Sequence, residues 1–268
     1  MPQRKDKLKS VPLQRVGLVS KSDKIPMMFH ELKRTRLDRV IVKDNENLVG
    51  VVTLRDIFTK LASKKFSNIS PKSLSIASFM SENLFYALED NTIDDVVKLM
   101  AEKNVSGVPV LDNKRKLLGI ITKNYLISLL ANELKGYVGD YIIRSGYKIS
   151  VGTSLATLSN EILKNVDVRE FVVVQENRLL GVVGEKELAY FLFNYLSDDN
   201  IINMKNALQS YVVNDILTFV NEPLKPSDPV QYAAKLFSNT NLVIYPVAKD
   251  DILLGVIRRR ELFNQLSR

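Results

Sequence analysis

The chain of 268 residues contains no cysteine and a single histidine, His30. Without thiols there are no disulfides, no thiolate metal ligands and no cysteine nucleophiles. One histidine also excludes most zinc sites and the serine–histidine and cysteine–histidine pairs of hydrolases. We therefore expect no catalytic residue, no metal site and no obligatory cofactor. The absence of cysteine suits an intracellular protein, and we expect a cytoplasmic one.

Long apolar runs are absent as well. No stretch approaches the roughly 18 apolar residues that a membrane span needs. The basic residues 1–10 are not followed by the apolar stretch of a secretory signal, so we expect no membrane partner. Neither G-x-x-x-x-G-K-[ST] nor G-x-G-x-x-G occurs, which removes the two common phosphate-loop motifs.

Positive charge is in excess, with 38 Lys and Arg against 30 Asp and Glu. It is densest at Arg4–Lys9, Lys33–Arg39 and Arg258–Arg260. A positive field attracts nucleotides, nucleic acids and acidic proteins alike, and a solvated surface explains any single run equally well. Nucleic acid is therefore one partner that the composition leaves open.

One short pattern, apolar–Gly–apolar–apolar, occurs four times, at 49–52, 118–121, 180–183 and 254–257. A second β-type run lies just upstream of each copy, at 39–42, 108–111, 171–174 and 244–247. A loop of Asp, Asn, Lys or Glu separates the two runs, as in an antiparallel hairpin. A helical run that includes Asp56, Tyr125, Glu187 or Glu261 follows each glycine.

An amphipathic helix is expected before each hairpin. Its apolar positions in the first unit are Ile25, Met28, Phe29 and Leu32, the i, i+3, i+4, i+7 stripe of a helix. The same stripe begins at Ile93, Leu155 and Val230, although Ser159 interrupts the third. Thr92 with Asp95 predicts a capping box, and Asp228-Pro229 predicts an N-cap followed by proline at the first helical position. The motif glycine lies 25 or 26 residues after the first stripe residue in every unit.

Each unit is thus predicted as strand, helix, strand, strand, helix. The first strands are expected within 16–19, 84–88, 147–151 and 217–224. This order implies an α/β (α+β) fold of four β-α-β-β-α units, at 1–68, 75–134, 135–197 and 210–268. A unit of about 60 residues buries little core alone, so we expect two paired modules, 1–134 and 135–268.

The units resemble cystathionine β-synthase (CBS) domains. The second, NTIDDVVKLMAEKNVSGVPVLDNKRKLLGIITKNYL, has the helix, the V-P-V-hydrophobic-D strand and the G-h-h-T of that family. The first ends in LVGVVTLRD, a full G-h-h-[ST]-x-x-D signature. The resemblance implies tandem pairs whose clefts bind adenine nucleotides, with the signature Asp on the ribose hydroxyls and the Thr on ribose or phosphate.

On this resemblance the first unit is the principal expected site, with Thr53 and Asp56 at the signature positions. Val19, Ser20 and Lys21 are expected to line its cleft, and Lys21 and Arg55 to supply charge for a phosphate. A plain helix N-cap explains Thr53 and Asp56 without a ligand and stays open.

The other units depart from the signature. The second has Tyr125 in place of Asp, and we expect no independent ribose site there. Its cleft is either empty or contributes Thr122 and Lys123 to the ligand of the first unit. The third has Gly184 and Glu187, and the fourth has Arg258 and Glu261. Glu187 is either a shifted ribose contact or an ordinary first-turn acid. Arg258 is either a phosphate clamp or the partner of a nearby carboxylate.

The sequence therefore favours a non-catalytic regulatory protein that binds AMP, ADP, ATP or a relative and signals its occupancy to a protein partner. Two alternatives remain at this point: a basic nucleic-acid-binding protein, and a structural assembly module with vestigial clefts. Homodimerisation is also left open.

Overall fold

The computed structural model describes residues 2–63, 69–165, 167–196, 204–250 and 252–267. The ends of the predicted first and third units, 64–68 and 197, lie outside these residues. Module one contains, in chain order, β1 Gly17–Ser20, α1 Ile25–Thr35, β2 Arg39–Asp44, β3 Asn47–Thr53, α2 Leu54–Leu61, β4 Ala87–Leu88, α3 Ile93–Glu102, β5 Gly107–Leu111, β6 Leu117–Thr122 and α4 Lys123–Leu129.

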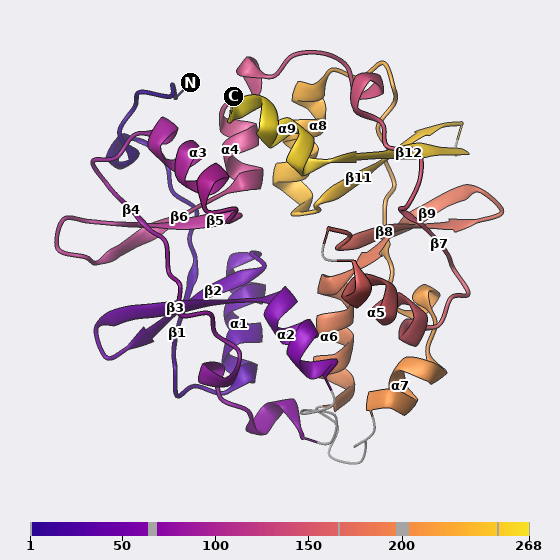
Figure 1. The fold of residues 1–268 in the computed structure, drawn as a ribbon, viewed down its shortest axis with the longest axis horizontal. Helices are drawn as coiled ribbons and strands as arrows, with labels where there is room; N and C mark the ends of the chain where they lie inside the picture. The colour runs from indigo at the N-terminus through magenta and orange to yellow at the C-terminus, as the bar shows by residue number, and fades with distance from the viewer. Residues whose placement is uncertain (1, 64–68, 166, 197–203, 251, 268) are drawn as a thin grey trace.

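The second half of the chain repeats this order (Figure 1). It contains β7 Lys148–Ser150, α5 Leu155–Lys164, β8 Glu170–Gln175, β9 Arg178–Gly184, α6 Glu185–Leu196, α7 Met204–Ser210, β10 Thr218–Phe219, α8 Val230–Thr240, β11 Ile244–Lys249, β12 Ile252–Arg258 and α9 Arg259–Leu266. Short 3-10 turns cover Leu8–Ser10, Pro71–Ser73, Ile76–Ser78, Ala131–Glu133, Val138–Tyr141 and Val213–Asp215. The α/β class is confirmed.

In the first three units the first strand pairs parallel with the second, and in all four units the second pairs antiparallel with the third. In the first unit Leu18 lies opposite Ile41 and Arg39 lies opposite Thr53. This register places the start of β2 and the end of β3 at one end of the sheet. The glycine strand then leads directly into a helix. In each unit this helix begins two residues before the position that the sequence analysis named, which is Asp56, Tyr125, Glu187 or Glu261.

The amphipathic stripes form the core as the periodicity predicts. Ile25, Met28, Phe29 and Leu32 on α1 are all buried, and each such side chain contributes about 1.5–3 kcal/mol by leaving water. Thr92 and Asp95 form the predicted capping box of α3. The prediction at the start of α8 was wrong by one residue. Pro229 itself is the extended N-cap, because Asp228 accepts a hydrogen bond from the backbone of Lys225 instead.

A segment leading into each unit crosses the glycine strand of its partner unit. These lead-in segments are 12–16, 79–86, 142–147 and 217–224. Four antiparallel bridges join them to the partner: Gln14 to Ile120, Ser81 to Val51, Ile143 to Val256 and Thr218 to Val182. The units are therefore interlocked in pairs, first with second and third with fourth.

The crossing explains the four motif glycines. A Cβ on Gly181 would lie 2.2 Å from the carbonyl oxygen of Thr218, and one on Gly50 would lie 2.5 Å from that of Ser81. The corresponding distances at Gly119 and Gly255 are 2.8 and 2.5 Å. No side chain fits where the backbone of a lead-in segment approaches this closely, so each motif glycine is required for its unit to pair with the partner unit.

The prediction of a first strand for unit four within 217–224 needs correction. Its ordered part, β10, pairs with β9 of the third unit and not with the sheet of the fourth. Only Leu224, at the end of the segment, bridges in parallel to Val247 of β11. The lead-in segment uses most of its length for the crossing, which leaves one residue for the strand position.

The two modules meet through helices in the middle of the molecule, with their hairpins pointing outward (Figure 1). Helix α2 packs on α6, and α4 packs on α8 and α9. Asn124, which is 2% exposed, joins the modules: its Nδ2 donates to the carbonyl of Phe237 at 2.7 Å, and its Oδ1 accepts from Arg259 at 2.6 Å. Within the described ranges no helix has the length and apolar character to cross a membrane.

Candidate nucleotide cleft

A cleft of about 220 Å³ lies between the first and second units. It is lined on one side by Thr53, Arg55 and Asp56 of the first unit, and on the other by the lead-in segment and the second unit. Its polar side chains are Arg39, Thr53, Arg55, Asp56, Ser81, Asn83, Asn104, Ser106 and Arg169. Leu84, Phe85, Pro109 and Ile120 give it an apolar side.

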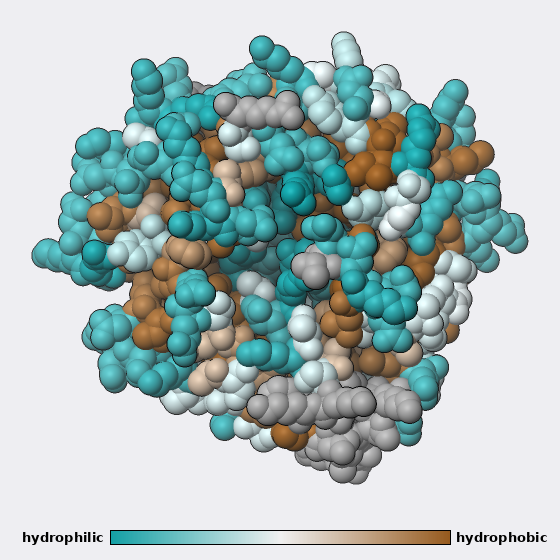
Figure 2. Space-filling model, in the orientation of Figure 1, coloured by the Kyte–Doolittle hydropathy of each residue, from teal (hydrophilic) through white to brown (hydrophobic). Residues whose placement is uncertain are grey.

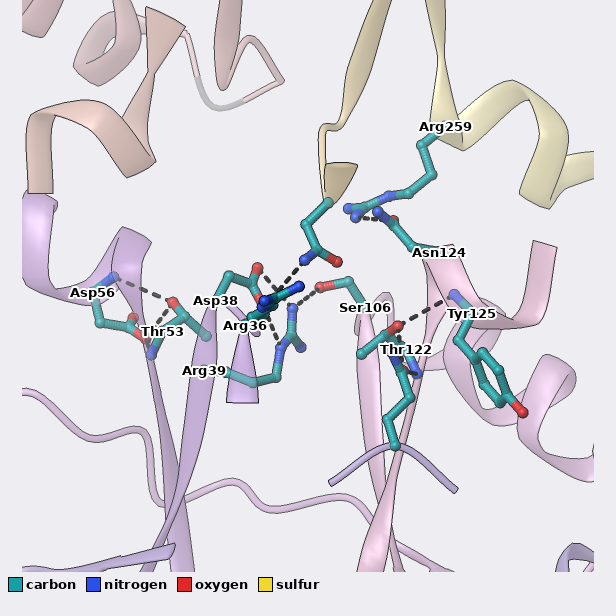
Figure 3. A network of polar contacts seen from close by, with 12 residues as sticks. Arg36, Asp38, Arg39, Thr53, Asp56, Ser106, Thr122, Asn124, Tyr125 and Arg259 are labelled. Atoms are coloured by element: carbon teal, nitrogen blue, oxygen red, sulfur yellow. Dashed lines mark hydrogen bonds and ion pairs between the residues drawn. The ribbon is translucent and has the colours of Figure 1, made fainter. Parts of the chain in front are cut away.

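Thr53 and Asp56 stand where β3 turns into α2 (Figure 3). Asp56 Oδ2 accepts hydrogen bonds from the backbone of Thr53 at 2.8 Å and from its hydroxyl at 2.7 Å. The second carboxylate oxygen, Oδ1, accepts no hydrogen bond from any described residue. The capping box therefore holds the carboxylate in place at the half-buried cleft wall and leaves one oxygen for a ligand.

Cationic side chains gather at the central end of the cleft. Arg55 lies 3.2 Å from Glu185 of the third unit, and Arg169 Nε donates to the same carboxylate at 2.7 Å. Glu185 is 4% exposed, and burial raises its pKa while both arginines lower it. These three side chains also line a second cavity, of about 310 Å³, between the modules. An ion-pair cluster thus spans the modules at the cationic end of the cleft.

Arg39 is the third cation and is 5% exposed. It binds Asp38 through Nε at 2.8 Å and Nη2 at 3.1 Å, and it donates to the Ser106 hydroxyl of the second unit at 2.9 Å (Figure 3). Burial alone would raise the pKa of Asp38, but the charge of Arg39 holds it well below its usual value. Figure 2 shows hydrophilic side chains at the centre of this face, where the units meet.

The matching position in the second unit is filled by the chain itself. Thr122 donates its hydroxyl to Gln14 Oε1 at 2.8 Å, and Tyr125 donates to the carbonyl of Pro12 at 2.7 Å. Lys123 points away, over the ring of Phe263 at 4.4 Å. Burial, with Arg259, Arg260 and Arg39 nearby, lowers the pKa of Lys123 to about 8.

In the third and fourth units, too, residues of the chain contact the signature positions, although Glu187 and Thr218 also line a cavity of about 600 Å³. Glu187 accepts hydrogen bonds from the backbone of Gly184 at 3.0 Å and from the hydroxyl of Thr218 at 2.8 Å. Arg258 forms an ion pair with Glu261 and donates to Tyr147 at 3.3 Å. Both acids therefore contact side chains of this chain, and Arg258 has the local carboxylate that the sequence allowed.

The structure does not bring Val19, Ser20 and Lys21 to this cleft, which corrects that expectation. Val19 is buried in the core, the backbone of Ser20 donates to Asp23, and Lys21 forms an ion pair with Asp44. The reason is the register of the sheet. Since β1 runs parallel to β2, it ends beside Lys43, at the opposite end of the sheet from Thr53.

Sequence reasoning missed Arg39, Arg169 and Glu185. Arg39 is the first residue of the second strand of unit one, and Arg169 directly precedes the second strand of unit three. At the same two positions, unit two has Ser106-Gly107 and unit four has Val243-Ile244. Charged residues at the start of an otherwise apolar strand were the available signal. Nothing in the sequence indicated that Arg169 of the second module would line a cleft of the first, or that Glu185 would be its partner.

Glu170 illustrates how these units differ. It takes in β8 the position that Arg39 has in β2, and its Oε2 accepts from the backbones of Val243 at 2.8 Å and Ile244 at 3.1 Å. Burial and the charge of Glu187 raise the pKa of Glu170 to about 7. Folding therefore favours its neutral form.

This raised pKa gives a pH-dependent stability. The stabilisation of the neutral form is fully present below pH 4.5, the ordinary value, and is lost as the pH rises through about 7. We expect Glu170→Gln, which keeps an acceptor oxygen without charge, to stabilise the protein by about 2 kcal/mol above pH 7 and to flatten this dependence. Thermal unfolding of both proteins across this range measures it, and parallel pH curves would contradict the assignment.

The architecture is that of paired, interlocked β-α-β-β-α units, and comparison identifies the family. The CBS domain model matches residues 8–63, 76–132 and 213–268. The chain belongs to the CBS domain family. The stretch from β7 to α6, which lies outside these three segments, has the element order strand, helix, strand, strand, helix as well.

Two archaeal proteins resemble the chain along most of its length. Protein MJ1225 from Methanocaldococcus jannaschii is 23% identical over 260 residues, which cover 90% of each chain. An uncharacterized 33.4 kDa protein in the ribosomal RNA operon of Thermofilum pendens is 21% identical over 276 residues, covering 94% of this chain and 88% of its own.

Solved structures share the whole fold. The crystal structure of MJ1225 superposes with a TM-score of 0.76 at 19% identity and covers 94% of this chain and 96% of its own. An uncharacterized conserved protein from Pyrococcus horikoshii gives a TM-score of 0.56 at 21% identity, covering 97% and 100%. The arrangement of both modules is thus shared with MJ1225.

Proposed function

We propose that the protein is a regulatory sensor that binds one adenine nucleotide in the cleft between its first and second units. The observation that carries this proposal is the fixed Asp56 carboxylate with its unused oxygen, in a cleft that three arginines also line. A carboxylate accepts hydrogen bonds from the two hydroxyls of a ribose, and one arginine side chain can donate to two phosphate oxygens at once. MJ1225, whose fold is similar, is described as a candidate archaeal homolog of g-AMPK.

Among the four units only the first keeps both the Thr and the Asp of the signature, and one oxygen of its Asp56 carboxylate accepts no hydrogen bond from the described residues. At the matching positions of the other units, Gln14, Thr218 and Tyr147 contact the groups that would meet a ligand. These contacts support one nucleotide per chain, in contrast to the four sites that a count of units would suggest. The four-unit domain organisation, with modules 1–134 and 135–268, is part of the same proposal.

Binding of a nucleotide in the cleft can be signalled to a partner protein through a change in the contact between the modules. Arg55 of α2 and Glu185 of α6 form an ion pair across helices that pack on each other. A phosphate at the cationic end competes with Glu185 for Arg55 and Arg169. Ligand binding then favours an arrangement of modules in which this ion pair is weaker, which is a shift of population between two arrangements.

Isothermal titration calorimetry with adenosine, AMP, ADP and ATP tests the proposal, and no binding of any of the four would overturn it. The competition with Glu185 gives a sharper expectation. Glu185→Gln should raise the affinity for the nucleotides about tenfold, because the Glu185 charge no longer competes with the phosphate for the arginines, and leave adenosine unchanged.

Glu161→Gln is the matched control for Glu185→Gln. Glu161 pairs with Lys164 on α5, away from the cleft, so its neutralisation changes the net charge equally without touching the arginines. Equal changes in the two variants would show a general field effect and contradict the competition.

A further inference from the structure

The outer edge of the first module contains a basic groove. It lies between the tip of the β2–β3 hairpin and the tip of the β5–β6 hairpin, which point to the same side in Figure 1. Its volume is about 660 Å³, and we call it the rim groove. Six of its lining residues are basic, namely Arg15, Arg34, Lys43, Lys114, Arg115 and Lys116, and only Glu46 is acidic.

Most of these cations have no carboxylate partner. Arg34 pairs with Glu31, and Arg115 lies over the ring of Tyr86 at 4.9 Å. For Arg15, Lys43, Lys114 and Lys116, no carboxylate of the described residues is within ion-pair distance. Four positive charges thus face the groove without compensation, a potential that attracts an anionic partner.

The floor of the groove is apolar. Leu18 is 39% exposed and Leu118 is 44% exposed, so both present apolar surface to the groove. Beside them, Val16, Leu48 and Leu117 belong to a small hydrophobic cluster between the two units. The groove therefore combines an apolar strip with a basic border.

The neighbouring cavity and the second module differ from the rim groove. On the other side of the same edge, a cavity of about 670 Å³ has three acidic residues, Asp44, Glu46 and Glu82, against Lys21 and Arg115. In the second module the two hairpins pair directly through Ile252 and Arg178, so all strands there form one sheet. In the first module they form two separate sheets, and the groove lies between them.

We propose that the rim groove docks an acidic segment of a partner protein that carries leucine-sized apolar side chains. The basic border fits the carboxylates, and the strip of Leu18 and Leu118 takes the apolar side chains. Nucleic acid fits less well, because no aromatic residue lines the groove for base stacking. The groove shares no residue with the nucleotide cleft, so this proposal stands independently of it.

A fluorescence-anisotropy titration with a labelled synthetic peptide of glutamate and leucine tests the proposal. We expect the triple variant Arg15→Glu, Lys114→Glu, Lys116→Glu to weaken binding about tenfold or more. The control is Arg144→Glu, Lys148→Glu, Lys249→Glu, which reverses three exposed cations of the second module and should change affinity less than about twofold.

The apolar strip has its own test. Leu18→Ser with Leu118→Ser should weaken the same peptide about tenfold, and replacing its leucines by serine should do likewise to the wild-type protein. Two results would contradict docking and indicate a nonspecific electrostatic attraction instead. One is an equal loss of peptide affinity in the rim variant and the control variant, and the other is equal affinity of the wild-type protein for the leucine and the serine peptides. Tighter binding of single-stranded DNA that the rim variant abolishes would assign the groove to nucleic acid. Dimers that the rim variant dissociates in sedimentation would assign it to a second copy.

Discussion

Replacing Gly181 by alanine should destabilise the protein by about 3 kcal/mol and lower its melting temperature by roughly 10 °C. The new methyl group would lie 2.2 Å from the carbonyl oxygen of Thr218 and 2.9 Å from its carbonyl carbon. These are backbone atoms that cannot rotate away, so β10 must separate from β9. Urea or thermal unfolding measures the loss.

Gly152→Ala is the matched control for this substitution. An added Cβ at Gly152 meets no atom within 4 Å, and its backbone is not left-handed, so we expect a change below about 0.5 kcal/mol. If the two variants unfold alike, the crossing of lead-in segments over the glycine strands does not hold the units together as described.

Asp56→Ala should weaken adenine-nucleotide binding by about 10-fold to 100-fold. The loss corresponds to charge-assisted hydrogen bonds to a ribose, at about 1.5–3 kcal/mol. The same substitution removes the Asp56 half of the capping box of α2 and should lower stability by about 1 kcal/mol. Calorimetry and thermal unfolding of the same preparations separate the two effects.

Asp95 provides an unusually close control. It forms the same capping box with Thr92, with distances of 2.8 Å from both the backbone and the hydroxyl, but it is exposed on α3 outside the cleft. Asp95→Ala should therefore cost the same stability and leave nucleotide affinity unchanged. Parallel losses of affinity in both variants would make Asp56 a helix cap only.

Local pattern predicted most of the fold. The stripes beginning at Ile25 and Ile93 fixed two helices, and the glycine spacing fixed the number and order of hairpins, since both depend on residues close in sequence. Helix starts were misplaced by one or two residues, at Pro229 for example, because local hydrogen bonds such as that of Asp228 decide the boundary.

The long-range features could not be read in this way. Gln14 bridges to Ile120 and fills the position beside Thr122, but the segment that contains Gln14 has no periodicity that indicates a partner. The structural role of the four motif glycines is also apparent only from the structure, where the backbone of a lead-in segment crosses each of them. Thr53 and Asp56 were found by motif, whereas Arg169 belongs to the cleft only because the modules pack face to face.

The position of bound nucleotide tests the central claim most directly. In crystals grown with AMP we expect one nucleotide per chain, between the first and second units, with ribose hydroxyls on Asp56 and phosphate beside Arg39, Arg55 or Arg169. An empty first cleft, or a nucleotide beside Thr122, Glu187 or Arg258, would contradict the account.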